Sequence, residues 1–446
     1  MSENAVPRRA FLGVTAATAL SYSRVMRANE RIQLGIIGCG ERGRGDLGNF
    51  VRTDTVNLAA VCDIYETNAE AGKKVGNNPS AKMFTDHRKL LETPGLDAVL
   101  IAVPDHWHSR IAIDALNAGK DVYVEKPLSL TVAEGRRMVQ VAAATNRVTQ
   151  VGIHRRSAKF LAEAAEFVRS GGIGRVTVAK GFHVLNEWPK GVANFPAGPP
   201  PNGSEWDQWL GPAPKVPYNK ARTYYTFRWF YDYSGGQMTN FGVHYMDMLR
   251  WCLGQDAPRA VTAMGGKYAI EDSREIPDTA EALWQFDGPT LMVFTQYNAN
   301  AAPANAQSAE MEIRGTKGTM YLHNERWEVV PEKITDQNIP ARTPLDRVTE
   351  RSYRPSRKPA MEPKSGKGSS DTAFHARNFL DCVKTRARCN CDVLTGHQST
   401  SATLIANIAL KTRSFLEWDA KAEKFTNNSA ANRYLSYEYR SPYKLG

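Results

Sequence analysis

The stretch "RIQLGIIGCGERGRG", residues 31–45, decides the fold of the first part of the chain. It begins as a short apolar strand and runs into the pattern G-x-G-x-x-G, after which "DLGNFVRT" can continue as a helix. The glycines of this pattern are Gly38, Gly40 and Gly43. A second apolar run ends at Asp63, about twenty residues after the last glycine, which is the spacing of a strand–helix–strand unit. We therefore predict an α/β domain with a doubly wound parallel sheet.

Each glycine has a role in a dinucleotide-binding Rossmann unit. Gly38 permits the tight turn, Gly40 lets the backbone approach a pyrophosphate, and Gly43 allows close packing of helix on strand. The phosphates would lie at the helix N-terminus, where the helix dipole favours negative charge. Arg42 and Arg44 could add charge-assisted contacts.

Asp63 is expected to accept hydrogen bonds from the hydroxyls of the adenosine ribose. A carboxylate at this position repels a 2′-phosphate, and the neighbouring Ile64 supplies no cation to offset it. NAD is therefore favoured over NADP. A doubly wound domain that binds no dinucleotide is the alternative.

Two later strands are expected to deliver polar residues to the same edge of the sheet. "AVLIAVPDHWH" places a loop from Pro104 to His108 after a buried strand, and "KDVYVEKPLSL" places Glu125 and Lys126 after the next. Ligands of such sheets lie beyond the carboxyl ends of the strands. A lysine there could bind a substrate hydroxyl and stabilise a developing alkoxide, whereas a solvated surface lysine is the alternative.

The stretch "GGQMTNFGVHYMDMLRW", residues 235–251, predicts a helix with two stripes. The polar stripe contains Asn240, His244, Asp247 and Trp251. The apolar stripe contains Phe241, Tyr245, Met248 and Cys252. If the apolar stripe faces the core, the polar stripe can face a cleft.

The bulk composition predicts a folded chain of two domains. The 446 residues are 42% hydrophobic, which indicates a sizeable core. The net charge of +11 comes from scattered basic residues, so we expect no nucleic-acid partner. Six cysteines without paired spacing predict buried thiols and no metal site.

The first thirty residues differ from the rest of the chain. Arg8 and Arg9 precede a short apolar stretch, Phe11 to Leu20, which is too short to span a bilayer. This pattern resembles a twin-arginine signal, which implies export to the periplasm after folding, and no transmembrane span is expected. An N-terminus that happens to contain an arginine pair is the alternative.

The order of the glycine loop, "VPDHWH", "YVEKPLS" and "GGQMTNFGVHYMD" resembles the Gfo/Idh/MocA oxidoreductases, from about residue 31 to the C-terminus. The resemblance implies a Rossmann domain at 31–150 and an α+β domain at 151–446 with an open, mostly antiparallel sheet. It implies that Lys126 is catalytic, that His244 exchanges a proton with the reacting hydroxyl, and that Pro104 and His108 line the nicotinamide ribose. Asn240 departs from the family, which commonly has an aspartate at that position.

These considerations together predict a set of site residues. The cofactor-binding residues are expected to be Gly38, Gly40, Arg42, Gly43, Asp63, Pro104, His108, Glu125 and Lys126. The substrate-binding residues are expected to be Trp107, Arg155, Arg228, Trp229, Tyr231, Asn240 and His244. Several of them lie in a long insertion rich in aromatic residues, which suits stacking on a sugar but equally suits a small core beneath a loop.

The leading functional hypothesis is an NAD-dependent oxidoreductase acting on a sugar, a polyol or a glycoside hydroxyl. Export would require a tightly held NAD that is recycled within the site. One alternative is a glycoside hydrolase that uses transient oxidation at C3, and a second is a non-catalytic sugar-binding protein. The resemblance also implies a homodimer or homotetramer.

Overall fold

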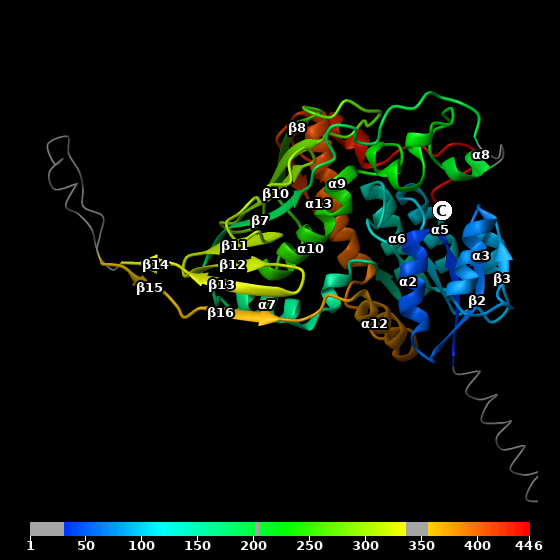
Figure 1. Ribbon diagram of the computed structural model, residues 1–446, viewed down its shortest axis with the longest axis horizontal. Helices are drawn as coiled ribbons and strands as arrows, with labels where there is room; N and C mark the ends of the chain where they lie inside the picture. Colours follow the sequence, from blue (N-terminus) through cyan, green and yellow to red (C-terminus); the bar gives the residue numbers. More distant parts are fainter. Residues whose placement is uncertain (1–30, 201–204, 336–355) are drawn as a thin grey trace, which may run out of the picture.

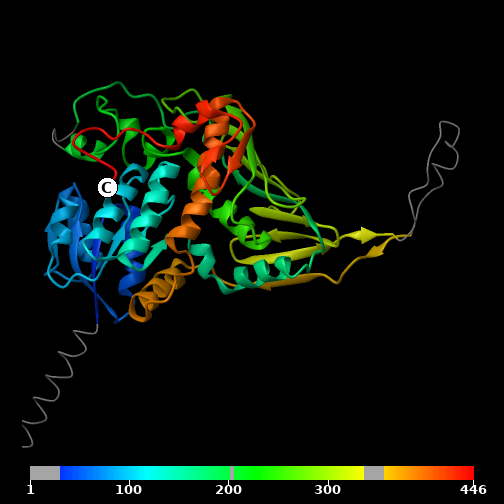
Figure 2. The same cartoon turned by 180° about the vertical axis from the view of Figure 1, so that it is seen from behind.

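The structure, a computed structural model, describes residues 31–200, 205–335 and 356–446 (Figures 1 and 2). The segment that resembles an export signal lies outside these residues, as does most of the basic stretch between Arg342 and Lys367. Within the described ranges, no helix combines the length and the apolar character needed to cross a bilayer.

The first sheet has six parallel strands in the order β3-β2-β1-β4-β5-β6. The strands are β1 (Ile32–Ile37), β2 (Val56–Cys62), β3 (Lys82–Phe84), β4 (Ala98–Ile101), β5 (Asp121–Val124) and β6 (Thr149–Val151). Its helices are α2 (Glu41–Val51), α3 (Glu66–Val75), α4 (His87–Leu91), α5 (Asp105–Asn117) and α6 (Val132–Thr145). Every residue of β4 and β5 is buried, because helices cover both faces of a parallel sheet. The strand order reverses between β1 and β4, and such a switch point is where ligands bind.

The second sheet has ten strands in the order β16-β13-β12-β11-β7-β10-β9-β8-β17-β18. The strands are β7 (Val176–Val184), β8 (Ala260–Gly266), β9 (Thr279–Gln285), β10 (Leu291–Tyr297), β11 (Met311–Gly315), β12 (Gly318–Leu322), β13 (Arg326–Pro331), β16 (Lys364–Lys367), β17 (Leu416–Asp419) and β18 (Lys424–Phe425). Among the described strand pairs of this second sheet, only β7 and β10 run parallel. The predicted fold class, a Rossmann domain followed by an α+β domain with a mostly antiparallel sheet, is confirmed. A separate ribbon, β14 (Lys333–Ile334) with β15 (Lys358–Pro359), projects from it (Figure 1).

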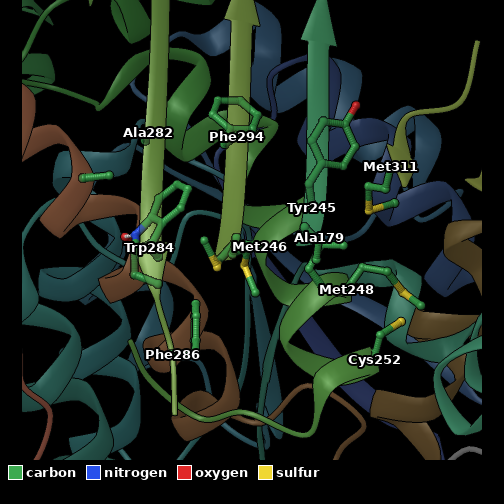
Figure 3. Close-up of a cluster of buried hydrophobic side chains, with 14 of the residues drawn as sticks. Ala179, Tyr245, Met246, Met248, Cys252, Ala282, Trp284, Phe286, Phe294 and Met311 are labelled. Carbon is green, nitrogen blue, oxygen red and sulfur yellow. Dashed lines mark hydrogen bonds between the residues drawn. The ribbon is translucent and has the colours of Figure 1, made fainter. Parts of the chain in front are cut away.

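One face of the ten-stranded sheet packs against helices. These are α7 (Lys159–Arg169), α9 (Gly236–Asn240), α10 (Gly242–Leu253) and α13 (Val393–Thr412). Shorter elements are α8 (Glu205–Leu210) and the 3-10 turns η1 (His154–Ser157), η2 (Lys220–Arg222), η3 (Tyr224–Trp229) and η4 (Ser429–Leu435). The apolar residues of α10 share one core cluster with Trp284 and Phe294 of the sheet, and the ring centroid of Tyr245 lies 6.2 Å from that of Phe294 (Figure 3).

The C-terminal helix α12 (Thr372–Thr385) lies against the first domain, beside α2 (Figure 1). The ring of Phe379 packs edge-on against Phe50 and Tyr123, with centroids 6.0 and 5.9 Å apart. The Asn49 amide also donates a hydrogen bond of 2.6 Å to the Thr372 hydroxyl. This helix therefore packs on the first domain, although it follows the second sheet in sequence.

The helix predicted over residues 235–251 is present as two consecutive helices, α9 and α10, interrupted at Phe241. The Phe241 amide still donates to the carbonyl of Gln237, so the two helices continue in nearly the same direction. Tyr245, Met248 and Cys252 are buried in the core, whereas Phe241 is partly exposed in a cavity.

Candidate active site

A cavity of about 1260 Å³ lies at the carboxyl ends of the first sheet and is closed by the second half of the chain. The first domain contributes the glycine turn, Asp63 and Lys126 to its wall. The second contributes Arg228, Asn240 and His244. Residues far apart in sequence therefore face the same space.

The glycine turn has the shape that a dinucleotide needs. Gly38 has φ +91°, and a Cβ there would lie 2.4 Å from the Ala102 carbonyl oxygen. A Cβ on Gly43 would lie 2.0 Å from the Gly38 carbonyl oxygen, so only glycine allows α2 to approach the turn. A Cβ on Gly40 would meet no atom within 4 Å, which leaves open space in front of the N-terminus of α2. No side chain caps this end of α2, so its amide groups can bind a pyrophosphate.

Asp63 closes the other side of the turn. Its carboxylate accepts hydrogen bonds from the backbone amides of Cys39, at 2.7 Å, and Tyr65, at 2.9 Å. Burial raises the pKa of this carboxyl, and these hydrogen bonds oppose the shift. Its remaining lone pairs face the cavity and can accept ribose hydroxyls. The residues present therefore fit a dinucleotide.

A buried ion-pair group lies behind the turn. Arg42 donates to Glu125 and pairs with Asp46, both at 2.9 Å. Burial and the Glu125 charge raise the pKa of Asp46. Burial also acts to raise the pKa of Glu125, but Arg42 and Lys126 outweigh it and hold the pKa at about 2. Glu125 therefore holds a negative charge more readily than Asp46 does.

Lys126 reaches across the cavity to the second domain. Its Nζ donates to the side-chain oxygen of Asn240 at 2.6 Å and to the Asn240 carbonyl at 3.3 Å. The Asn240 amide in turn donates to Gln237 at 2.9 Å. Burial lowers the pKa of Lys126 to about 8, although the Glu125 charge opposes the shift. The ammonium group thus meets a neutral amide, which binds it without cancelling its charge.

His244 is 6% exposed, and its Nδ1 has no hydrogen-bond partner within the described chain. Its ring centroid lies 5.1 Å from that of His154. Burial, and then the positive charge of Lys126, lower the pKa of His244 well below its usual value. The imidazole is therefore neutral at physiological pH and can accept a proton.

The downstream half of the predicted polar stripe does not face the cavity, contrary to expectation. The Asp247 carboxylate accepts from Arg156 at 2.8 Å and from the Ser399 hydroxyl at 2.6 Å. The Arg156 guanidinium also lies over the Trp251 ring, 5.2 Å from its centroid. These partners occupy the Asp247 carboxylate, so it makes no contact with His244.

Most of the other predicted residues line the cavity, and the rest are held in the interior. The predicted residues in the cavity wall are Gly38, Gly40, Arg42, Asp63, Pro104, Trp107, Glu125, Lys126, Arg228, Asn240 and His244. Those outside the wall are Gly43, His108, Arg155, Trp229 and Tyr231. Gly43 acts through packing, as its predicted role requires.

His108 was expected to contact the nicotinamide ribose, but its side chain lies outside the cavity wall and contacts two backbone carbonyl groups. Its two ring nitrogens lie 2.7 Å from the Pro127 carbonyl oxygen and 2.9 Å from that of Val103. The ring therefore ties the Lys126 loop to the end of β4. Arg155 is likewise occupied, because it forms a 2.7 Å ion pair with Glu310.

Trp229 and Tyr231 belong to a small core beneath the aromatic insertion. Trp229 is 1% exposed, and the Arg274 guanidinium lies 4.2 Å from its ring centroid. The Tyr231 backbone amide donates to Glu275, and its side chain packs against the same core. The structure places these two residues in the small core that the sequence had left as the alternative, because aromatic composition alone cannot separate a core from a binding wall.

Several cavity residues were not predicted. Asp105 is the first residue of α5, so the stretch predicted as a loop begins a helix there; it is 5% exposed and accepts from the Ser234 hydroxyl at 2.5 Å. Tyr65 stacks on Tyr224 of the insertion, with centroids 5.7 Å apart. Tyr443 packs edge-on against Trp107, so the C-terminal segment closes one end of the cavity. The position of Tyr65, two residues after Asp63, was an available signal, whereas nothing in the sequence placed Tyr443.

All six cysteines are buried and unpaired. The described residues hold no group of three or more His, Cys, Asp or Glu side chains positioned for a metal ion.

A parallel nucleotide-binding sheet that shares one cavity with a lysine and a histidine is typical of dinucleotide-dependent oxidoreductases. Residues 32–153 match the oxidoreductase family with an NAD-binding Rossmann fold, and residues 165–285 and 355–445 match that family's C-terminal alpha/beta domain. The chain belongs to the Gfo/Idh/MocA oxidoreductase family and carries its NAD-binding domain.

Named relatives extend this assignment. The chain is 26% identical to the myo-inositol 2-dehydrogenase of Thermotoga maritima over 309 residues, which is 69% of this chain and 79% of that protein. It is 34% identical to glycosyl hydrolase family 109 protein 1 of Shewanella sp. strain ANA-3 over 125 residues, but this match spans only 27% of that relative and 26% of this chain. A solved levoglucosan dehydrogenase in complex with NADH and levoglucosan superposes with a TM-score of 0.62 at 18% identity, covering 87% of this chain and 99% of that one. This last likeness shows the fold alone.

Proposed function

We propose that this protein is an NAD-dependent dehydrogenase that oxidises a hydroxyl of a sugar or polyol. The observation that carries the proposal is that Lys126 and His244 line the same cavity as the glycine turn, and that Nδ1 of His244 has no hydrogen-bond partner in the described chain. NAD, when bound, supplies the hydride acceptor. The myo-inositol 2-dehydrogenase relative supports a polyhydroxylated substrate.

The chain's own residues would perform the proton chemistry. The Lys126 ammonium exchanges its hydrogen bond with Asn240 for one to the substrate oxygen and stabilises the negative charge that develops there. His244 accepts the hydroxyl proton, because burial keeps its imidazole neutral. The Asn240 amide remains beside both groups and can orient a second hydroxyl.

NAD is proposed over NADP because of Asp63. Its carboxylate lies in the cavity wall and would meet a 2′-phosphate with like charge. Arg88, a nearby cation, is engaged by Asp86 through several contacts, one of 2.7 Å. Calorimetric titration with both cofactors tests this, and tighter binding of NADP would contradict it.

A glycosidase that oxidises its substrate transiently is the second candidate. The partial match to a family 109 glycosyl hydrolase favours it, and the same two residues would serve. The experiment is to load the protein with NAD and add sugars, polyols and aryl glycosides. Net appearance of NADH absorbance supports the dehydrogenase, release of the aglycone without net reduction supports the glycosidase, and cofactor binding without either indicates a sugar-binding protein.

Export by the twin-arginine pathway and assembly into a homodimer or homotetramer complete the proposal. Replacement of Arg8 and Arg9 by lysine should retain a fused reporter in the cytoplasm.

The outer face of the ten-stranded sheet carries the exposed side chains Met264 and Leu291, which favours association through that face. Light scattering of the purified protein would contradict this part if it found a monomer.

A further inference from the structure

Some of the lysines and arginines that line the cavity form ion pairs with carboxylates, and the others do not. The lining lysines and arginines are Arg42, Arg88, Arg110, Lys126, Arg228 and Lys444. The first three form ion pairs of 2.5 to 2.9 Å with buried or half-buried carboxylates. The other three form no salt bridge with any residue that the structure describes. Lys444 lies in the C-terminal segment, which leaves Lys126 and Arg228 at the catalytic end.

Arg228 is held in place but lacks an anion. Its guanidinium carbon lies 3.7 Å from the centroid of the Tyr225 ring, which fixes the plane of the group. Its Nε is buried and has no acceptor in the described chain. A buried donor of this kind is costly unless something binds to it. Burial lowers the pKa of Arg228, which is the direction expected for a cation without a counter-ion.

The nearby carboxylates do not neutralise this pair of cations. Glu125 is already shared with Arg42. Asp105 and Glu187 are the other acids whose charge reaches Arg228, but Asp105 accepts its hydrogen bond from the Ser234 hydroxyl and Glu187 pairs with Arg274 at 3.0 Å. Burial raises the pKa of Asp105. Lys126 itself contacts only the neutral oxygens of Asn240. The substrate end of the cavity therefore holds two cations, Lys126 and Arg228, that form no ion pair with any described residue.

We propose that the substrate is a sugar acid, whose carboxylate binds Arg228 while its reacting hydroxyl binds Lys126. The inference rests on the proposed dehydrogenase function and names its substrate class. A carboxylate matches the planar donors of a guanidinium and would give the buried Arg228 Nε the acceptor that the described chain does not supply. A neutral sugar would leave the Arg228 Nε without a charged acceptor, and a site built to bind a charged group discriminates strongly against a ligand that lacks it.

The test compares matched pairs of ligands on the NAD-loaded protein. The pairs are glucuronate with glucose, galacturonate with galactose, mannuronate with mannose, and gluconate with glucitol. Calorimetry measures binding, and NADH absorbance measures turnover. In at least one pair the acid should bind about tenfold or more tightly than its neutral partner. Equal or tighter binding of the neutral partner in every pair, or no binding by any ligand, would overturn the inference.

Variants separate charge recognition from a structural role. Arg228→Gln should remove the preference for the acid while changing the affinity for the neutral partner by no more than about twofold, and Arg228→Lys should restore part of it. The matched control is Arg326→Gln, a half-exposed arginine on β13 outside the cavity, which should keep the full preference. Equal loss of affinity for acid and neutral ligands in Arg228→Gln would contradict the proposal.

Measuring binding and turnover separately distinguishes a failure of the proposed substrate class from a failure of the proposed dehydrogenase function. Binding of an acid that depends on Arg228, with no reduction of NAD by any ligand, would support the substrate class and contradict the dehydrogenase. Oxidation of neutral sugars only, with no preferential binding of acids, would support the dehydrogenase and contradict the substrate class.

Discussion

The two halves of the polar stripe in residues 235–251 differ in what surrounds them. Asn240 and His244 face the cavity, and His244 keeps an unpartnered ring nitrogen. Asp247 and Trp251, one and two turns later, are both occupied by Arg156. All four positions share one helical spacing, but only the upstream pair lies in the cavity wall. Buried polar groups are normally satisfied, so an unpartnered buried atom beside a cavity, such as His244 Nδ1, is a candidate contact for a ligand.

The largest expected effect comes from a substitution in the upstream half of the stripe and is a loss of catalytic rate. His244→Ala should lower kcat by about 10² to 10⁴, the range typical for loss of a general base. The melting temperature should change little, because the described chain makes no hydrogen bond to this ring. Single-turnover reduction of bound NAD measures the rate. The matched control is His397→Ala, a buried histidine paired with Glu423 at 2.6 Å outside the cavity, which should lose stability and keep kcat.

The next largest effect comes from a substitution in the downstream half of the stripe and is a decrease in the free energy of unfolding. Asp247→Ala leaves the Arg156 guanidinium without its carboxylate, and loss of one partner from a buried ion pair costs about 3–5 kcal/mol. Urea unfolding measures this loss, while the kcat of the folded fraction should stay within a few-fold of the wild type. A double variant that adds Arg156→Met should recover part of the stability. A stable but inactive Asp247→Ala protein would show that this half also takes part in catalysis.

A third change makes the upstream half resemble the charged downstream half. Lys126 must be protonated to donate, and its pKa is lowered to about 8, so the rate should fall as pH rises through about 8. Asn240→Asp would place a carboxylate against the ammonium, raise its pKa and move this alkaline limb upward by about one pH unit or more. The pH profile of kcat is the measurement, and Asn240→Leu, which adds no charge, is the control. An unmoved alkaline limb would show that another group sets it.

The smallest expected effect concerns Trp251. Trp251→Leu removes the ring beneath Arg156, and a contact of this kind contributes about 0.5–1 kcal/mol at a partly exposed site. Thermal unfolding should show a modest decrease in stability with no change in activity. A large loss of activity would mean that the downstream half supports the cavity more directly than its contacts indicate.

Much of the fold could be predicted because most strands of the first sheet are short, largely buried apolar runs separated by turns and helices. The strands ending at Ile37, Cys62 and Val124 follow directly from such runs. The glycine turn could be predicted for a similar reason, since Gly38 has a backbone conformation that other residues rarely adopt. The position of α12 could not, because an amphipathic helix shows that it has an apolar face but not which core receives it.

The site was predicted less completely than the fold. Lys126 follows a strand whose end is fixed by topology, so its place in the cavity could be inferred. Trp229 and Tyr231 lie in an insertion without periodicity, and the sequence offers no rule for which of its aromatic side chains face solvent. Tyr443 reaches the cavity only because the C-terminal segment returns to the first domain.

The sequence by itself determined the class of domain, the glycine turn and the acidic residue after β2, because each depends on local spacing along one element. The catalytic roles predicted for Lys126 and His244 came from the resemblance to the family. Only the tertiary structure decided which polar residues remain unpartnered. Hydrogen-bond and ion-pair partners come from elements distant in sequence, as Ser399 does for Asp247 and Asn240 does for Lys126. Whether a side chain is free to bind a ligand depends on those partners, and local spacing carries no information about them.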